Sequence, residues 1–233
     1  MNKIFYLLDE LLLLRFLNVV NFDEEEAKKL LLKNLEVRRN NPNIFEKRDI
    51  FNTDIQQAVQ VYQIYVLPRN TAENHKVSIF RLGEHDPAKY VLEDIVRMAS
   101  ASLDARFVMI DDQELINGEI LIHDMAGYSF KHLLKCVSNM SIISKYMKFS
   151  QEAAPVKLIQ IHFINCSPVV TKIVNFFKPF LNPEVVDSMS FHSDINTLYK
   201  SVPRELLPID LGGSVGDVEE FFKVWKKKFL SKR

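Results

Sequence analysis

Residues 118–127, with the sequence GEILIHDMAG, place a short apolar run directly before a long helical pattern. Residues 119–123 are typical of a buried strand, and a helix is expected from about Ser129 to Phe149. The same order recurs along the chain, with further strands expected at 77–82, 157–164 and 188–191. Strands that alternate with helices predict an α/β fold with a mixed, largely parallel sheet covered by helices.

The N-terminal part of the chain has a different pattern, because strand signals begin only after Pro68. One helix is expected over residues 4–19, and a second begins at Asp23, whose carboxylate is suited to cap it. We therefore predict a small all-helical module at residues 1–66 and an α/β domain at residues 67–233.

The composition indicates a compact protein of the reducing cytoplasm. Of 233 residues 47% are hydrophobic, and 30 basic residues cancel 30 acidic ones, so no global charge favours nucleic acid. Two cysteines, Cys136 and Cys166, are too few for a disulfide framework. Asp9 and Arg15 interrupt the apolar run 4–20, which argues against a signal peptide and against a membrane span.

One catalytic-looking pattern occurs, the G-x-S-x-G match at residues 212–216. A nucleophile elbow needs a histidine after the serine, but the last histidine, His192, precedes Ser214. The glycines are therefore interpreted as a turn, and a serine hydrolase is the least favoured alternative. Glycine-rich nucleotide motifs are absent and the six histidines lack metal-ligand spacing, so we predict neither cofactor nor metal, and no enzyme activity.

Two apolar stripes remain to be explained. Residues 169–189 carry the first at helical spacing, and Pro179 and Pro183 predict that it forms a broken helix. The second follows the expected helix after Ser129, with the members Phe130, Leu133, Leu134, Val137, Ile142, Ile143 and Tyr146. Periodicity alone favours an ordinary core helix for the first stripe. The stripes and the sheet either close into a core or enclose an apolar cavity, and composition does not separate these alternatives.

Several strings resemble the CRAL-TRIO lipid-binding family, in its tocopherol-transfer and retinaldehyde-binding branch. They cover nearly the whole chain in the family's order: DELLLLRFL at 9–17, NFD at 21–23, GEILIHDMAG at 118–127, PVK at 155–157, IHFIN at 161–165, KPFL at 178–181, and LP at 207–208 with GG at 212–213. The resemblance implies an α/β lipid-binding domain with a helical N-terminal module and a mobile lid helix.

It further implies that one hydrophobic ligand lies between the sheet and the lid. The expected pocket residues are Phe130, Leu133, Leu134, Val137, Ile143, Tyr146, Ile161 and Phe163. The expected lid residues are Val169, Val170, Ile173, Val174, Phe177, Phe180 and Leu181. Lys157 keeps one basic position of the family's head-group contact, but other basic positions are absent, so phosphoinositide binding is expected to be weak at most.

The resulting prediction is a monomeric carrier that moves a tocopherol, retinoid, carotenoid or similar lipid through the cytoplasm as cargo. It would contact membranes transiently, bind no nucleic acid and catalyse nothing. Burying an apolar ligand contributes about 25 cal/mol per Å², which suffices to drive uptake. The alternative is a membrane-tethering or interaction module whose pocket is filled by its own side chains.

Overall fold

The computed structural model describes residues 10–108 and 115–231. A five-stranded sheet lies at its centre, in the order β1 (Tyr62–Val66), β2 (His75–Leu82), β3 (Gly118–Asp124), β4 (Leu158–Ile164) and β5 (Met189–Phe191). β1 pairs antiparallel with β2, and all other neighbours are parallel. This confirms the predicted α/β class and adds β1, a strand that the sequence pattern did not indicate.

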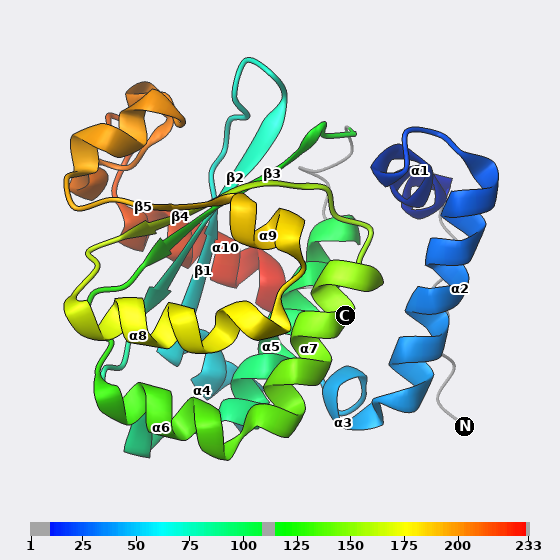
Figure 1. Cartoon of the computed structure of the whole chain (residues 1–233), viewed down its shortest axis with the longest axis horizontal. Coiled ribbons are helices and arrows are strands. Elements are labelled where there is room, and N and C mark those ends of the chain that lie inside the picture. The colour runs from blue at the N-terminus through cyan, green and yellow to red at the C-terminus, as the bar shows by residue number, and fades with distance from the viewer. Residues whose placement is uncertain (1–9, 109–114, 232–233) are drawn as a thin grey trace.

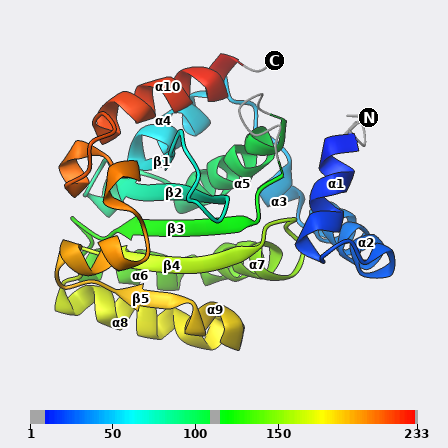
Figure 2. The ribbon, with the colours of Figure 1, turned by 90° about the horizontal axis from the view of Figure 1, so that it is seen from above.

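The sheet divides its side chains between two environments, because neighbours along a strand point to opposite faces. Val77, Ile79, Ile120, Ile122 and Ile164 enter the main core, which also contains Leu198, Val202, Leu207 and Phe222 of the C-terminal segment. Helix α10 (Val218–Ser231) lies by β1, at the opposite edge of the sheet from β5 (Figure 2). The other face carries Phe80, Leu121, Ile161 and Phe163, and it borders the site described below.

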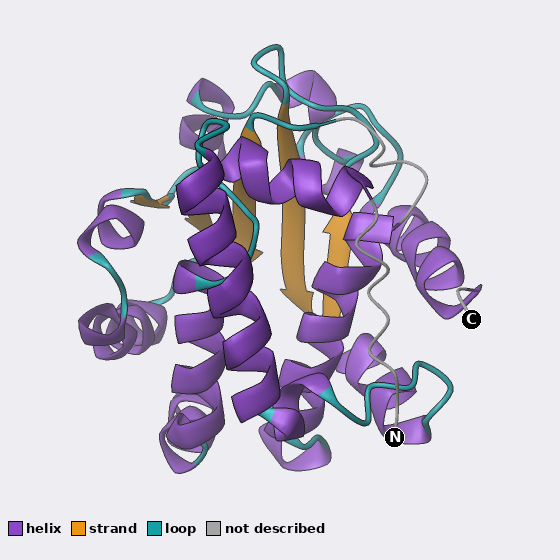
Figure 3. Cartoon of the chain, turned by 90° about the vertical axis from the view of Figure 1, so that its right-hand side faces the viewer, coloured by secondary structure: helices purple, strands orange, loops and turns teal. Residues whose placement is uncertain are grey.

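The domain also contains the helices α4 (Thr53–Val61), α5 (Leu92–Val108), α6 (Phe130–Ser138), α7 (Met140–Glu152) and α8 (Pro168–Phe177). Helices stand in front of the sheet in Figure 3. The single helix expected after Ser129 is divided at Asn139 into α6 and α7. Asp86 caps a 3-10 turn, Pro87–Lys89, and α5 begins after it at Leu92. None of the helices in the described ranges has both the length and the apolarity of a membrane span.

The N-terminal module consists of α1 (Glu10–Val19), α2 (Glu24–Asn40) and the short α3 (Pro42–Phe45), and it stands beside the sheet (Figure 1). The first residues of the helix expected from residue 4 lie outside the described residues. Asp23 caps α2 as predicted, since its carboxylate accepts a hydrogen bond from the Glu26 amide at 3.0 Å.

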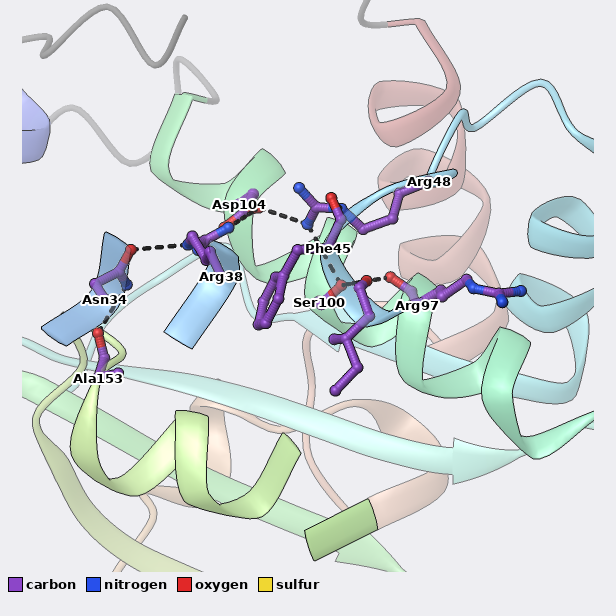
Figure 4. Close-up of polar contacts among 9 residues, drawn as sticks. Asn34, Arg38, Phe45, Arg48, Arg97, Ser100, Asp104 and Ala153 are labelled. Atoms are coloured by element: carbon purple, nitrogen blue, oxygen red, sulfur yellow. Dashed lines mark hydrogen bonds and ion pairs between the residues drawn. The ribbon is translucent and has the colours of Figure 1, made fainter. Parts of the chain in front are cut away.

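A buried polar network joins this module to the domain (Figure 4). Arg38 of α2 donates two hydrogen bonds, of 2.9 and 2.7 Å, to Asp104 of α5, and Arg48 donates a third at 2.6 Å. Asn34 donates to the carbonyl of Ala153 after α7, at 2.7 Å. The module is therefore anchored on α5 and α7, the two helices that also border the site.

Candidate functional site

An apolar pocket of about 380 Å³ lies between the sheet, helices α5 and α7, and the segment that follows α8. Its volume is within the range of small-molecule sites. The apolar lining residues are Ile64, Phe80, Ala99, Leu103, Leu121, Tyr146, Ala154, Val156, Leu158, Ile161, Leu181 and Val185. Polar side chains of Ser102, Arg106, Glu119, Ser150, Gln151, Asn182 and Glu184 interrupt this surface.

The last part of the broken segment 168–187 forms one wall of the pocket, through Leu181, Asn182, Glu184 and Val185. The segment consists of α8, a 3-10 turn (Lys178–Phe180) and α9 (Pro183–Asp187). Pro179 lies within the turn and Pro183 opens α9, so both prolines occupy the breaks that the sequence predicted. Leu181 and Val185, on either side of the second break, face the pocket.

Gln151 of α7 connects the pocket to this wall. Its side-chain oxygen accepts a hydrogen bond from the Asn182 amide at 2.7 Å, and its nitrogen donates to the Phe180 carbonyl at 3.2 Å. The same nitrogen donates to the Met147 carbonyl of its own helix at 3.0 Å. One side chain thus holds the main chain on both sides of Leu181.

Of the residues expected in the pocket or lid, three line it: Tyr146, Ile161 and Leu181. Phe163, Val170 and Val174 lie next to it in a cluster that also contains Ile161. Ile173 is buried in α8, and Ile143 packs against the cluster around Phe45 and Phe149.

The remaining expected residues lie elsewhere. Val169, Phe177 and Leu133 are half-buried, whereas Phe180 is exposed. Phe130, Leu134 and Val137 are exposed on α6, at 55%, 51% and 44% of their surface. Lys157 is exposed next to the N-terminal module, with its Nζ 3.5 Å from Asn21 Oδ1, and it is not a lining residue.

A row of stacked rings crosses the same face of the sheet. The ring centroids of Phe80 and His123 are 4.8 Å apart, those of His123 and Phe163 5.3 Å, and those of Phe163 and Phe191 5.0 Å. Burial lowers the pKa of His123 to about 4, so the imidazole is neutral at neutral pH. The row of rings therefore remains uncharged across four strands.

Sequence reasoning missed the polar part of the pocket. Arg106 of α5 and Glu119 of β3 form a buried ion pair on its wall, with two hydrogen bonds of 2.9 and 2.7 Å. The available signal was Glu119 itself, an acid at the start of an otherwise apolar strand. Gln151 carried no signal, because its role depends on where the broken segment folds back.

The G-x-S-x-G match forms a tight turn. Gly212 has a positive φ of 78°, and a Cβ on Gly213 would lie 1.9 Å from the Leu207 carbonyl oxygen, so both positions require glycine. Ser214 is exposed in this turn. Among the described residues, no three His, Cys, Asp or Glu side chains are grouped to hold a metal ion.

An α/β domain with an apolar pocket beneath a broken helix defines a class of hydrophobic-ligand binding proteins. Comparison with known proteins agrees: residues 60–213 match the CRAL/TRIO domain, and residues 3–55 match the Pinta-like UBA domain. The first match covers more than half of the chain, which therefore belongs to the CRAL/TRIO family, as its sequence strings predicted. Proteins of this family bind or transfer lipids and are generally not enzymes.

Curated relatives include clavesin-2 of Mus musculus, which is 29% identical over 207 residues, 88% of this chain and 62% of the relative. Alpha-tocopherol transfer protein-like of Mus musculus is 26% identical over 221 residues, 91% of this chain and 60% of the relative. The chain thus spans about three fifths of these relatives' length. The crystal structure of Sfh5 shares the fold, with a TM-score of 0.55 at 15% identity over 95% of this chain and 81% of that one.

Proposed function

We propose that this protein binds a single hydrophobic lipid in the pocket and carries it between membranes without chemical change. The observation that carries the proposal is the apolar pocket of about 380 Å³, of which one wall is a broken helical segment. Removing the ligand from water drives uptake, and the few polar lining groups orient it. The candidate cargo is a tocopherol, retinoid, carotenoid or similar lipid.

The lid in this proposal is the segment 178–187. Its breaks at Pro179 and Pro183 leave the main chain without a continuous helical ladder, and Gln151 supplies the contacts that hold it closed. Opening it would withdraw Leu181 and Val185 from the pocket wall and give the ligand a path out.

Mass spectrometry of lipid extracted from the purified protein tests the proposal directly. We expect about one lipid per chain in the wild type. Leu121→Trp, which fills the pocket from β3, should abolish the lipid while leaving the chain folded. Leu32→Trp, at an exposed position of α2, is the matched control and should retain the lipid. An equal lipid content in both variants would refute binding in this pocket.

A second candidate is a membrane-tethering module, and the exposed apolar face of α6 favours it. Phe130, Leu134 and Val137 are spaced at i, i+4 and i+7, so they form one stripe on the helix surface. Helix α6, which carries the stripe, runs beside α8, the first part of the broken segment (Figure 1). The same stripe serves a carrier during delivery, and the lipid content of the purified protein separates the two functions.

A further inference from the structure

The ion pair between Arg106 and Glu119 is the one strongly polar feature deep in the described pocket wall. Both side chains are buried, with 9% and 4% of their surface exposed. The guanidinium uses two of its nitrogens on the two carboxylate oxygens, at 2.9 and 2.7 Å, in the bidentate arrangement that is strongest for this pair.

Among the described residues that line the pocket, three carry charges: Arg106, Glu119 and Glu184. Glu184 is exposed near the second break of the lid, so its carboxylate is hydrated. The single lining cation is therefore already engaged by a lining carboxylate. Lys76 is the register neighbour of Glu119 on β2 and is buried, but it is not a lining residue.

This arrangement treats charged and uncharged ligand heads differently. A carboxylate or phosphate that enters would meet Glu119 as a like charge, and it would reach the guanidinium only by displacing Glu119. Displacement would leave a buried carboxylate without its counter-ion, which is strongly unfavourable. A hydroxyl or carbonyl group requires no displacement, because it accepts or donates single hydrogen bonds beside an intact pair.

Other lining groups suit an uncharged head. Burial raises the pKa of Tyr146, so its phenol stays protonated and neutral. Ser102 lies one turn before Arg106 on α5, and its hydroxyl donates to the Met98 carbonyl at 2.8 Å, which leaves its oxygen able to accept.

Building on the lipid-carrier function proposed above, we propose that the Arg106–Glu119 pair selects the cargo by its head group. Lipids with uncharged polar ends, such as alcohols, are accepted, and lipids with anionic ends are rejected. Glu119 is the specificity-determining residue, because its carboxylate already pairs with the Arg106 guanidinium that an anionic head would need.

Two matched pairs of lipids test this: hexadecanol against hexadecanoic acid, and retinol against retinoic acid. Each is measured at pH 8 by competition with a pyrene-labelled fatty alcohol. The wild type should bind each alcohol at least tenfold more tightly than its acid. Glu119→Gln keeps the shape and one hydrogen-bond acceptor but removes the carboxylate charge beside the guanidinium, so the acid should gain at least tenfold relative to the alcohol.

Glu36→Gln is the control, because it removes the same charge from an exposed position of α2 that does not line the pocket; the ratio should change less than twofold. If Glu119→Gln does not fold, Glu119→Ala replaces it, with lipid-induced thermal stabilisation as the readout. An acid that binds the wild type as well as its alcohol, or equal ratios in Glu119→Gln and Glu36→Gln, overturns the selection. Either result leaves the proposed lipid-carrier function intact. A folded protein that binds none of the four lipids contradicts both that function and the head-group selection.

Discussion

The Asn182 amide donates a 2.7 Å hydrogen bond to the side chain of Gln151, so a residue of α7 holds the main chain at the second break of the lid. The same amide group of Gln151 reaches the Phe180 carbonyl on the other side of Leu181. The Leu181 amide closes the turn on the Lys178 carbonyl at 3.1 Å, and the Asn182 carbonyl accepts from the Val185 and Val186 amides of α9. The Asn182 amide, which lies between the turn and α9, is therefore held by the Gln151 side chain.

We predict that Gln151→Met loosens the lid. It keeps the side-chain length but removes both hydrogen bonds to the segment, at a cost of about 1 kcal/mol each. Amide exchange at residues 178–188 should accelerate about tenfold, and lipid transfer between liposomes should become faster. Gln57→Met is the control, since Gln57 donates a comparable hydrogen bond, to the Lys89 carbonyl, away from the lid. Equal exchange in both variants would show that Gln151 does not hold the lid.

A second prediction concerns acid sensitivity. His162 of β4 and His192, just after β5, are both buried, and His162 Nδ1 lies 2.9 Å from His192 Nε2. The Thr197 hydroxyl donates to the Asp194 carbonyl, so it accepts from His192 Nδ1. His192 Nε2 must then accept from His162, and the pair is built for two neutral rings.

Burial, together with His192, lowers the pKa of His162 to about 4, and burial lowers the pKa of His192. An unfolded chain takes up these protons near pH 6.5, so stability is complete above that pH and falls as the pH drops toward 4. The loss attributable to His162 is about 3 kcal/mol. Urea unfolding between pH 7.5 and 4.5 measures it, and His162→Gln should flatten the pH dependence. An unchanged slope in that variant would place the sensitivity elsewhere.

The third prediction concerns the junction with the N-terminal module. Asp104 accepts from both Arg38 and Arg48, and all three side chains are largely buried. Asp104→Asn removes the carboxylate charge that both buried guanidinium groups contact, and we expect a loss of about 3–5 kcal/mol in the free energy of unfolding. Lys29→Ala, which removes an exposed ion pair with Glu26 on α2, should cost far less, because solvent screens an exposed pair. Urea denaturation distinguishes these outcomes, and equal losses would contradict a structural role for the junction.

The predictable parts of the fold were those that local chemistry determines. The strands β2, β3 and β4 are apolar runs bounded by polar turns, and the Asp23 cap fixes the start of α2. Pro179 and Pro183 interrupt the helix of the lid whatever the lid packs against. The family resemblance added the order of these elements, and the match over residues 60–213 confirmed it.

What escaped prediction depends on contacts between distant residues. β1 is too short to give a recognisable strand pattern in the sequence. It forms because it can pair with the edge of β2. The break at Asn139 contains no proline; the Asn139 side chain donates to the Lys135 carbonyl instead, and a new helix starts there. The Arg106–Glu119 pair joins a helix to a strand, so no periodicity within either element reveals it.

The last prediction concerns the exposed stripe on α6. Phe130 and Leu134 lie more than half exposed on one face of that helix, beside the lid-bearing segment. Phe130→Ser with Leu134→Ser removes apolar surface that we expect to enter the membrane during delivery, so co-sedimentation with liposomes should fall at least tenfold. Stability should change by less than about 1 kcal/mol, because neither side chain is buried. Leu32→Ser with Leu35→Ser removes a similar exposed apolar pair from α2 and should leave sedimentation unchanged. Equal loss in both double variants would indicate non-specific adsorption, and no loss in either would remove α6 from the membrane-facing surface.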